Sequence, residues 1–203
     1  MSPIRDPRAG QDQTSAPAKI ALVGLRGSGK STVGDVLARE LGREFVDLDL
    51  EIERLYAAES AEEPPLSAGE ILLALGEPAF RRIESAALSE VLARPEPLVL
   101  ACGGGTVIDA ENRARLRASA WVVWLEAPPE ELARRVASDR TLRPPLTPAG
   151  VAQGAGSAAE MRAVLDARRE FLEEVSHLRI RTEGLSPEQV ARMLRGGLAF
   201  PQA

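Results

Sequence analysis

The chain has 203 residues, 44% hydrophobic and 27% charged, with a formal net charge of −5 and a pI of about 5.2. This length suits one α/β domain with a full core, the acidic balance argues against a nucleic-acid surface, and a single cysteine excludes an internal disulfide. No apolar run is long enough to span a membrane, and residues 1–17 lack the apolar stretch of a signal peptide. We therefore expect a cytoplasmic protein with a disordered tail (1–17) and one domain (18–203).

Short apolar runs alternate with helical patterns along the chain, which is typical of a mostly parallel sheet covered on both faces. A helix is predicted from Lys30 to a stop at Gly42, a second begins around Pro78, and the sequence SPEQ (186–189) predicts a capping box that opens the last helix. Strands are predicted at 19–24, 44–49, 97–102, 121–127 and 177–182.

Two segments interrupt this alternation. Residues 57–69 are acidic and rich in proline, and residues 147–159 are small and almost uncharged. Both are predicted to be mobile loops. The first is interpreted as a tolerated surface insertion, and the second as part of a lid that closes over a site.

The sequence GLRGSGKS (24–31) lies between a predicted strand and a predicted helix, and it is typical of a loop that holds a polyphosphate. Its glycines allow a sharp turn that aims backbone N–H groups inward, and the following helix adds its positive end. Lys30 is expected to reach the β- and γ-phosphates, and the Ser31 hydroxyl is expected to bind Mg²⁺.

Asp47 and Asp49 end the second predicted strand, and their spacing places both carboxylates on one face of that strand. One could serve Mg²⁺ and the other a substrate hydroxyl, although an acidic helix start explains the pair equally well. Arg81 and Arg82 open a helix, and because neighbouring residues on a helix do not share a face, at most one is expected to point into a site.

Gly103, Gly104 and Gly105 follow a buried strand directly, so something is expected to approach that backbone closely: either the turn needs a positive φ, or a small ligand lies on the peptide N–H groups. Cys102 is interpreted as a small buried filler rather than a nucleophile. His177 is interpreted as a helix cap or a surface residue.

The ordered set of motifs resembles the shikimate kinase family over nearly all of residues 18–195. The motifs are GLRGSGKST, VDLDLEIE, GEPAFRRIE, ACGGG, LRPPL, DARREFLEEV and IRTEGLSP. The resemblance implies the P-loop kinase fold, a three-layer α/β/α arrangement with a five-stranded parallel central sheet, a substrate-binding segment at about 49–93 and a mobile lid at about 140–160. It also implies ATP-dependent phosphorylation of shikimate to shikimate 3-phosphate, within aromatic amino acid biosynthesis.

The resemblance further implies a role for individual residues. Catalysis is implied for Lys30, Asp49 and Arg143. Nucleotide binding is implied for Gly27, Ser28, Gly29, Lys30, Ser31, Thr32, Arg143 and Pro187. Shikimate binding is implied for Asp49, Arg81, Gly103, Gly104, Gly105 and Arg168. Mg²⁺ is the implied cofactor, with Ser31 and Asp47 as its ligands. The expected partners are ATP and shikimate, without nucleic acid or membrane, and the expected state is a monomer.

These roles suit the chemistry, because an arginine pair can bind the carboxylate of shikimate and an aspartate can orient the attacking hydroxyl. The chain departs from the family in the lid, where it reads RPPL instead of RPLL, and after Arg168, where Phe171 and Leu172 replace leucine and tyrosine.

Two other functions stay open at this stage. Another small-molecule P-loop kinase, such as a gluconate kinase, would share the fold and donor site but would not need the arginine pair with the glycine triplet. A kinase-like sensor domain would be expected to have lost Lys30, Ser31 or Arg143, and all three are present.

Overall fold

The computed structural model describes residues 17–60, 64–138 and 155–198. Within them, a five-stranded parallel sheet has the strand order β2-β3-β1-β4-β5. The strands are β1 (Lys19–Val23), β2 (Glu44–Asp47), β3 (Leu98–Ala101), β4 (Trp121–Glu126) and β5 (Leu178–Arg181). The predicted α/β class and all five predicted strands are therefore confirmed.

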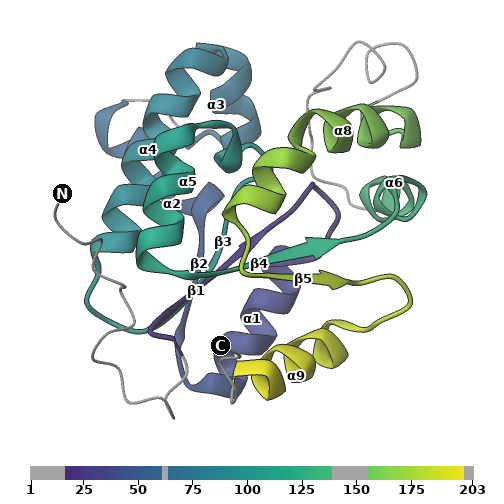
Figure 1. Ribbon diagram of the computed structural model, residues 1–203. Helices are drawn as coiled ribbons and strands as arrows, with labels where there is room; N and C mark the ends of the chain where they lie inside the picture. Colours follow the sequence, from purple (N-terminus) through teal and green to yellow (C-terminus); the bar gives the residue numbers. More distant parts are fainter. Residues whose placement is uncertain (1–16, 61–63, 139–154, 199–203) are drawn as a thin grey trace, which may run out of the picture.

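Helices cover both faces of the sheet, so the molecule has three layers (Figure 1). Below the sheet in Figure 1 lie α1 (Lys30–Leu41) and α9 (Pro187–Leu198). The helices on the other side, together with one turn of 3-10 helix named η1, are α2 (Leu48–Glu59), α3 (Ala68–Leu75), α4 (Glu77–Ala93), η1 (Thr106–Ile108), α5 (Ala110–Ser119), α6 (Pro129–Ser138) and α8 (Ala158–Val175).

The central strands are continuous apolar runs because both of their faces are buried. Alternate residues of β1 enter two separate clusters: Ile20 and Leu22 pack with Leu37 of α1, whereas Ala21 and Val23 pack among the helices of the opposite layer. This double burial makes β1 the centre of the core, and it fixes the position of the loop that follows Val23.

The predicted helix boundaries agree with the structure where local signals are strong. The α1 helix ends at Gly42, whose φ of 63° suits a left-handed cap, and Pro78 lies in the first turn of α4. Ser186 and Gln189 form the predicted capping box of α9, because the Ser186 backbone N–H donates to the Gln189 side chain at 2.7 Å and the Gln189 N–H donates back to Ser186 Oγ.

Three boundary predictions were wrong. The strand predicted at 44–49 ends at Asp47, where α2 begins, since the Asp47 carboxylate accepts the Asp49 N–H and caps the helix. The loop predicted at 57–69 is shorter, because helices occupy its two ends. The segment predicted as a loop at 147–159 includes the first two residues of α8, 158 and 159, and its residues 147–154 lie outside the described residues.

The carboxyl ends of β1, β2 and β3 meet at one edge of the sheet, where α/β proteins place their ligand sites. The phosphate loop (24–29), Asp47 and the glycine triplet (103–105) each follow one of these strands directly. Parallel pairing therefore gathers three separate motifs into one place. Of the helices in the described part of the chain, none combines the length and apolar character that a bilayer crossing needs.

Candidate functional site

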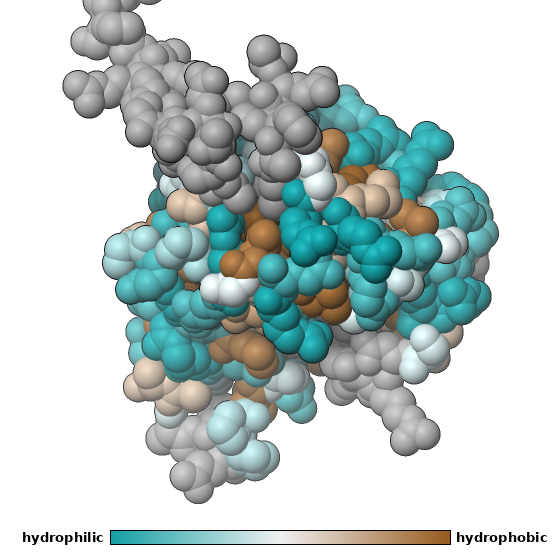
Figure 2. Space-filling view, turned by 90° about the horizontal axis from the view of Figure 1, so that it is seen from below, coloured by the Kyte–Doolittle hydropathy of each residue, from teal (hydrophilic) through white to brown (hydrophobic). Residues whose placement is uncertain are grey.

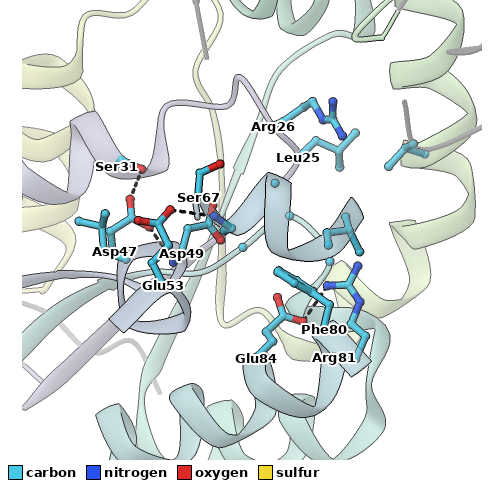
Figure 3. Close-up of a pocket in the computed structure, with 18 of the residues that line it drawn as sticks. Leu25, Arg26, Ser31, Asp47, Asp49, Glu53, Ser67, Phe80, Arg81 and Glu84 are labelled. Atoms are coloured by element: carbon cyan, nitrogen blue, oxygen red, sulfur yellow. Dashed lines mark hydrogen bonds and ion pairs between the residues drawn. The ribbon is translucent and has the colours of Figure 1, made fainter. Parts of the chain in front are cut away.

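A cavity of about 420 Å³ opens at this edge of the sheet. It is bounded by the phosphate loop, the first turns of α2, α3 and α4, the glycine triplet and α8 (Figure 3). The predicted site residues that line it are Ser31, Asp47, Asp49, Arg81, Gly103, Gly104, Gly105 and Arg168. Ser31 and Arg168, which are 137 positions apart in the sequence, thus line one cavity.

The phosphate loop has the backbone that its glycines predict. Gly24, Gly27 and Gly29 have φ values of 143°, 78° and 91°, which L side chains rarely adopt. A Cβ at Gly24 would also lie 2.4 Å from the carbonyl oxygen of Leu125 in β4. The loop is therefore held tightly against the sheet, and it leads directly into the N-terminus of α1.

Lys30 spans the mouth of this loop, since its Nζ donates to the carbonyl oxygen of Leu25 at 2.9 Å. The ammonium group is thereby held beside the N-terminus of α1, where an anion is favoured. Ser28 is a buried residue of the loop itself, and Thr32 is exposed in the first turn of α1. The predicted strand, loop and helix context of the phosphate loop is confirmed.

Ser31 and Asp47 form a ready pair of oxygen ligands. The Ser31 hydroxyl donates to Asp47 Oδ2 at 2.6 Å, so a hydroxyl from α1 and a carboxylate from the end of β2 meet beside the phosphate loop (Figure 3). Mg²⁺ in kinases is commonly bound by one or two protein oxygens, substrate phosphates and waters. The oxygen atoms of Ser31 and Asp47 fit Mg²⁺, and these two predicted ligands lie next to each other.

Asp49 lies in the first turn of α2 rather than on a strand, which corrects the geometry predicted for the pair. The interpretation as an acidic helix start is right about its local structure, yet Asp49 also lines the cavity. Its carboxylate faces the glycine triplet, because an ideal Cβ at Gly103 would lie 3.1 Å from Asp49 Oδ1. Asp47 and Asp49 therefore face the same site from a helix cap and a helix turn.

Arg81 points into the site, and its neighbour Arg82 is exposed, as expected for adjacent residues on a helix. The Arg81 guanidinium donates to Glu84 at 2.7 Å and to Glu77 at 3.2 Å. Glu84 is only 1% exposed and also accepts the Thr106 hydroxyl at 2.8 Å. Burial alone would lower the pKa of Arg81, but the Glu84 and Glu77 carboxylates raise it, so the cation is firmly retained.

Arg168 enters the cavity from α8, and its Nη1 donates to the carbonyl oxygen of Gly104 at 2.7 Å. Burial, reinforced by repulsion from Arg81, lowers the pKa of Arg168 to about 10. Two guanidinium groups that repel one another across a polar cavity would both gain from an anion between them. The pair is therefore a candidate carboxylate site.

The helix that carries Arg168 is fixed to the turn after β3 by Arg113. The Arg113 side chain donates to the Val107 carbonyl oxygen and to the Glu174 carboxylate, at 2.9 and 2.8 Å. Its guanidinium also stacks on the ring of Phe171, 4.5 Å from the ring centroid. Phe171 is one of the residues at which the chain differs from the family pattern. It thus anchors α8 one turn beyond Arg168.

None of Gly103, Gly104 and Gly105 has a positive φ, so the backbone conformation of the triplet does not require glycine. Glycine is needed here because other groups of the protein lie too close to leave room for a side chain. A Cβ at Gly105 would lie 2.2 Å from Arg81 Nη2, and one at Gly103 would lie 2.9 Å from Glu84 Oε1. The positive-φ interpretation was wrong for these three residues. What approaches the backbone is the protein's own Arg81 and Glu84.

We expect Gly105→Ala to lower the free energy of unfolding by about 1–3 kcal/mol, because the new methyl group would push the Arg81 guanidinium off the buried Glu84 carboxylate. Denaturant unfolding measures this loss. Gly104→Ala is the matched control, since its Cβ would find its nearest neighbour at 3.6 Å, an ordinary contact. Equal losses in the two variants would contradict the steric explanation.

The predicted nucleotide-site residues Gly27, Ser28, Gly29, Lys30, Thr32 and Pro187 do not line the cavity, and neither do Cys102 and His177. Cys102 is 2% exposed, and burial raises the pKa of its thiol, so its interpretation as an inert filler is confirmed. His177 is neither a helix cap nor a fully exposed residue: it is half-buried beside β4, where its Nδ1 accepts the Val122 N–H at 3.0 Å. Arg143 lies outside the described residues.

Three further residues, for which the sequence predicts no role, shape the site. Arg26 lines the cavity from within the phosphate loop, and Glu53 lines it while accepting the Ala68 N–H at the start of α3, at 2.9 Å. Arg135 of α6 donates to the carbonyl oxygens of Gly27 and Thr182, at 3.4 and 3.0 Å. Arg26 lies within the motif GLRGSGKST and Glu53 within the motif VDLDLEIE, whereas no sequence pattern marks Arg135.

Arg135 thereby links the phosphate loop to the segment that leads into α9, whose first residue is Pro187. Pro187 itself does not line the described cavity.

Comparison with known proteins agrees with this geometry. A family model for shikimate kinase matches residues 26–196. The shikimate kinase of Symbiobacterium thermophilum is 40% identical over 174 residues, which are 84% of this chain and 90% of that protein. The solved structure of shikimate kinase from Acinetobacter baumannii in complex with shikimate is 32% identical, with a TM-score of 0.76, and the match covers 94% of this chain and 95% of that one.

A likeness to another class of kinase extends to the fold alone. A gluconokinase from Sinorhizobium meliloti superposes with a TM-score of 0.59 at 24% identity, over 90% of this chain and 92% of that one. The fold alone therefore does not distinguish this chain from that gluconokinase, and the acceptor side of the cavity has to do so.

Proposed function

The chain belongs to the shikimate kinase family, and from that premise we propose how its site carries out the ATP-dependent phosphorylation of shikimate to shikimate 3-phosphate. One observation supports the assignment of roles most strongly. The phosphate loop and the pair of Arg81 and Arg168 open on the same cavity, so a phosphate donor and a carboxylate-bearing acceptor can meet there.

On the donor side, the N–H groups of the loop and the positive end of α1 bind the phosphates of ATP, with Lys30 at the β- and γ-phosphates. Gly27, Ser28, Gly29 and Thr32 belong to this phosphate site. Ser31 and Asp47 would hold Mg²⁺, which would supply positive charge to neutralise the phosphates of ATP. The 2.6 Å hydrogen bond between the two side chains supports this assignment, because it keeps both oxygen ligands together before the ion arrives.

On the acceptor side, Arg81 and Arg168 bind the carboxylate of shikimate, and the glycine triplet provides a surface without side chains on which the ring lies. Asp49 orients the attacking hydroxyl and accepts its proton. Glu84 acts through Arg81: it is buried, and it fixes the guanidinium while Thr106 fixes Glu84. Preorganisation of this kind places the acceptor for in-line attack.

The remaining parts of the nucleotide site stay predictions. Pro187 is proposed to contact the nucleotide from the start of α9. The link that Arg135 makes between Gly27 and Thr182 supports this proposal, because it holds the phosphate loop and the segment before Pro187 together. Arg143, proposed to bind the transferring phosphate from a lid, lies outside the described residues.

The test of substrate identity is ADP release with ATP and a panel of acceptors: shikimate, quinate, gluconate and nucleoside monophosphates. We expect turnover with shikimate to exceed turnover with gluconate and the nucleotides, since those lack a ring that presents one carboxylate to Arg81 and Arg168. Comparable rates with gluconate would contradict the acceptor assignment while leaving the donor site intact.

Arg81→Lys is expected to raise the KM for shikimate by about 10- to 100-fold, because lysine keeps a charge beside Glu84 but loses one charge-assisted hydrogen bond to the carboxylate. The KM for ATP should change little. Arg82→Lys is the matched control, one residue away and exposed. Steady-state kinetics with each substrate varied in turn measures both constants, and a similar rise for both substrates would make Arg81 a structural residue.

We also propose that the protein is a cytoplasmic monomer. ATP, its donor substrate, is a cytoplasmic metabolite, and on the face seen from below, which carries α1 and α9 in Figure 1, hydrophilic side chains predominate and the hydrophobic ones form separate patches (Figure 2). Light scattering should return the chain mass of 21.7 kDa. A stable mass of twice that value would contradict the proposal.

A further inference from the structure

Arg113 is a charged residue of α5 that lies in the interior of the protein. Its side chain is only 11% exposed, and it is not among the residues that line the acceptor cavity. The two helices α5 and α8 lie side by side on the same face of the sheet (Figure 1). Because an arginine is rarely buried unless its charge has partners, the contacts of this side chain indicate what it does.

The Arg113 guanidinium joins two separate elements. On one side, its Nη1 donates to the carbonyl oxygens of Val107 and Ile108, each at 2.9 Å, in the turn η1 that directly follows the glycine triplet. On the other side, its Nε donates to the Glu174 carboxylate at 2.8 Å, and the group lies over the ring of Phe171. Both of the latter residues belong to α8, so one planar group holds this helix against the turn after β3.

The same two elements form one half of the candidate carboxylate site. Arg168 lies one turn before Phe171 and nearly two turns before Glu174 on α8, and its Nη1 donates to the Gly104 carbonyl oxygen at 2.7 Å. The helix therefore meets the turn after β3 twice, at the cavity through Arg168 and farther along through Arg113. A shift of α8 against this turn would displace the Arg168 guanidinium within the cavity.

The position of Arg168 is electrostatically unfavourable before an anion binds. Burial, reinforced by repulsion from Arg81, lowers the pKa of Arg168, so the surroundings disfavour its charge. A movement of α8 that brings this guanidinium closer to water would relieve that cost. The contacts of Arg113 oppose such a movement, and a binding group that is held in place in advance binds its ligand more tightly.

We propose that Arg113 is a positioning residue for the acceptor: from outside the cavity, it holds α8 against the turn after β3 so that Arg168 stays in place for the carboxylate. The inference rests on the proposed function and adds a residue to it. The competing role is purely structural, with no preference for either substrate. Fold stability is a weak reason for an arginine here, because apolar residues of similar size often replace a buried ion pair without loss.

The first test is Arg113→Lys, which keeps the charge but loses the planar fork that reaches both elements. In ADP-release assays with each substrate varied in turn, we expect the KM for shikimate to rise about 5- to 20-fold. The kcat should stay within about threefold, and the KM for ATP should not change. Arg115→Lys is the matched control, because Arg115 lies on the same helix and pairs with Glu111 at 2.8 Å on the surface.

The second test asks whether the effect passes through Arg168. The kcat/KM for shikimate is measured at subsaturating shikimate and saturating ATP, with Arg113→Lys added to Arg168→Met or to Arg81→Lys. Beside Arg168→Met, the further loss should be about twofold or less, because no guanidinium remains on α8 to be positioned. Beside Arg81→Lys, which changes α4, the loss should appear in full. The same loss in both backgrounds would overturn the inference.

Glu174→Gln weakens the same contact from α8, and it decides the question if Arg113→Lys does not fold, since the Glu174 side chain is 53% exposed. It should raise the KM for shikimate about two- to fivefold and leave the KM for ATP unchanged. An unchanged shikimate KM, or equal rises for both substrates, would overturn the inference alone. Wild-type protein that releases no ADP with shikimate would overturn the proposed function, and the inference with it.

Discussion

Lys30→Ala is expected to reduce kcat by about 10³-fold while the protein stays folded. Lys30 Nζ already lies in the mouth of the phosphate loop, 2.9 Å from the Leu25 carbonyl oxygen, so its charge needs little rearrangement when the phosphates bind. Such a preorganised cation stabilises the charge that develops on the transferring phosphoryl group, and alanine leaves that charge unmet.

The measurement is single-turnover and steady-state ADP release, with thermal unfolding as the check on folding. Lys19→Ala is a matched control, because Lys19 is the chain's other lysine and begins β1, at the opposite end of that strand from the loop. It should retain wild-type kcat. A folded Lys30→Ala protein with full turnover would remove the nucleotide assignment of the loop.

Asp49→Asn is expected to lower kcat by about 10²- to 10⁴-fold, the range for loss of a positioned general base. Asparagine has nearly the same shape, so it can keep the place of the side chain beside Gly103 in the first turn of α2. It cannot accept the proton of the attacking hydroxyl. The loss should therefore appear in kcat, with a smaller rise in the KM for shikimate.

Initial rates at varied shikimate and saturating ATP separate the two constants. Asp35→Asn provides the control, since Asp35 is exposed on α1 and pairs with Arg39. If Asp49→Asn keeps its kcat and raises only the KM, Asp49 binds the hydroxyl without accepting its proton. In that case the phosphoryl transfer would depend on positioning and charge neutralisation alone.

The framework of the fold could be predicted from the sequence because its signals are local. The strands of the core are short apolar runs, since both faces of a parallel sheet are buried, and the helices carry apolar residues at helical spacing. Helix ends could also be predicted where one residue sets the boundary: Gly42 after α1, Pro78 in the first turn of α4, and Ser186 before α9.

Local signals were insufficient where two of them compete. Residues 44–49 alternate like a strand, but the Asp47 side chain captures the Asp49 N–H, and this cap ends β2 and starts α2 two residues earlier. The hydrogen bond forms between side chain and backbone, so a hydrophobic pattern does not register it. The identity of Asp49 as a cavity residue was predicted, whereas its secondary structure was not.

The sequence by itself determined the chemistry available to this protein: a glycine loop with Lys30 for phosphates, two aspartates, and arginines with a glycine triplet, in the order of a shikimate kinase. The tertiary structure alone decided how these groups act together. It brought the buried Glu84 against Arg81, pressed both against Gly103 and Gly105, and turned Arg26 into the acceptor cavity. Such contacts join elements far apart in the chain, and their geometry depends on how the helices pack against the sheet, which no local pattern encodes.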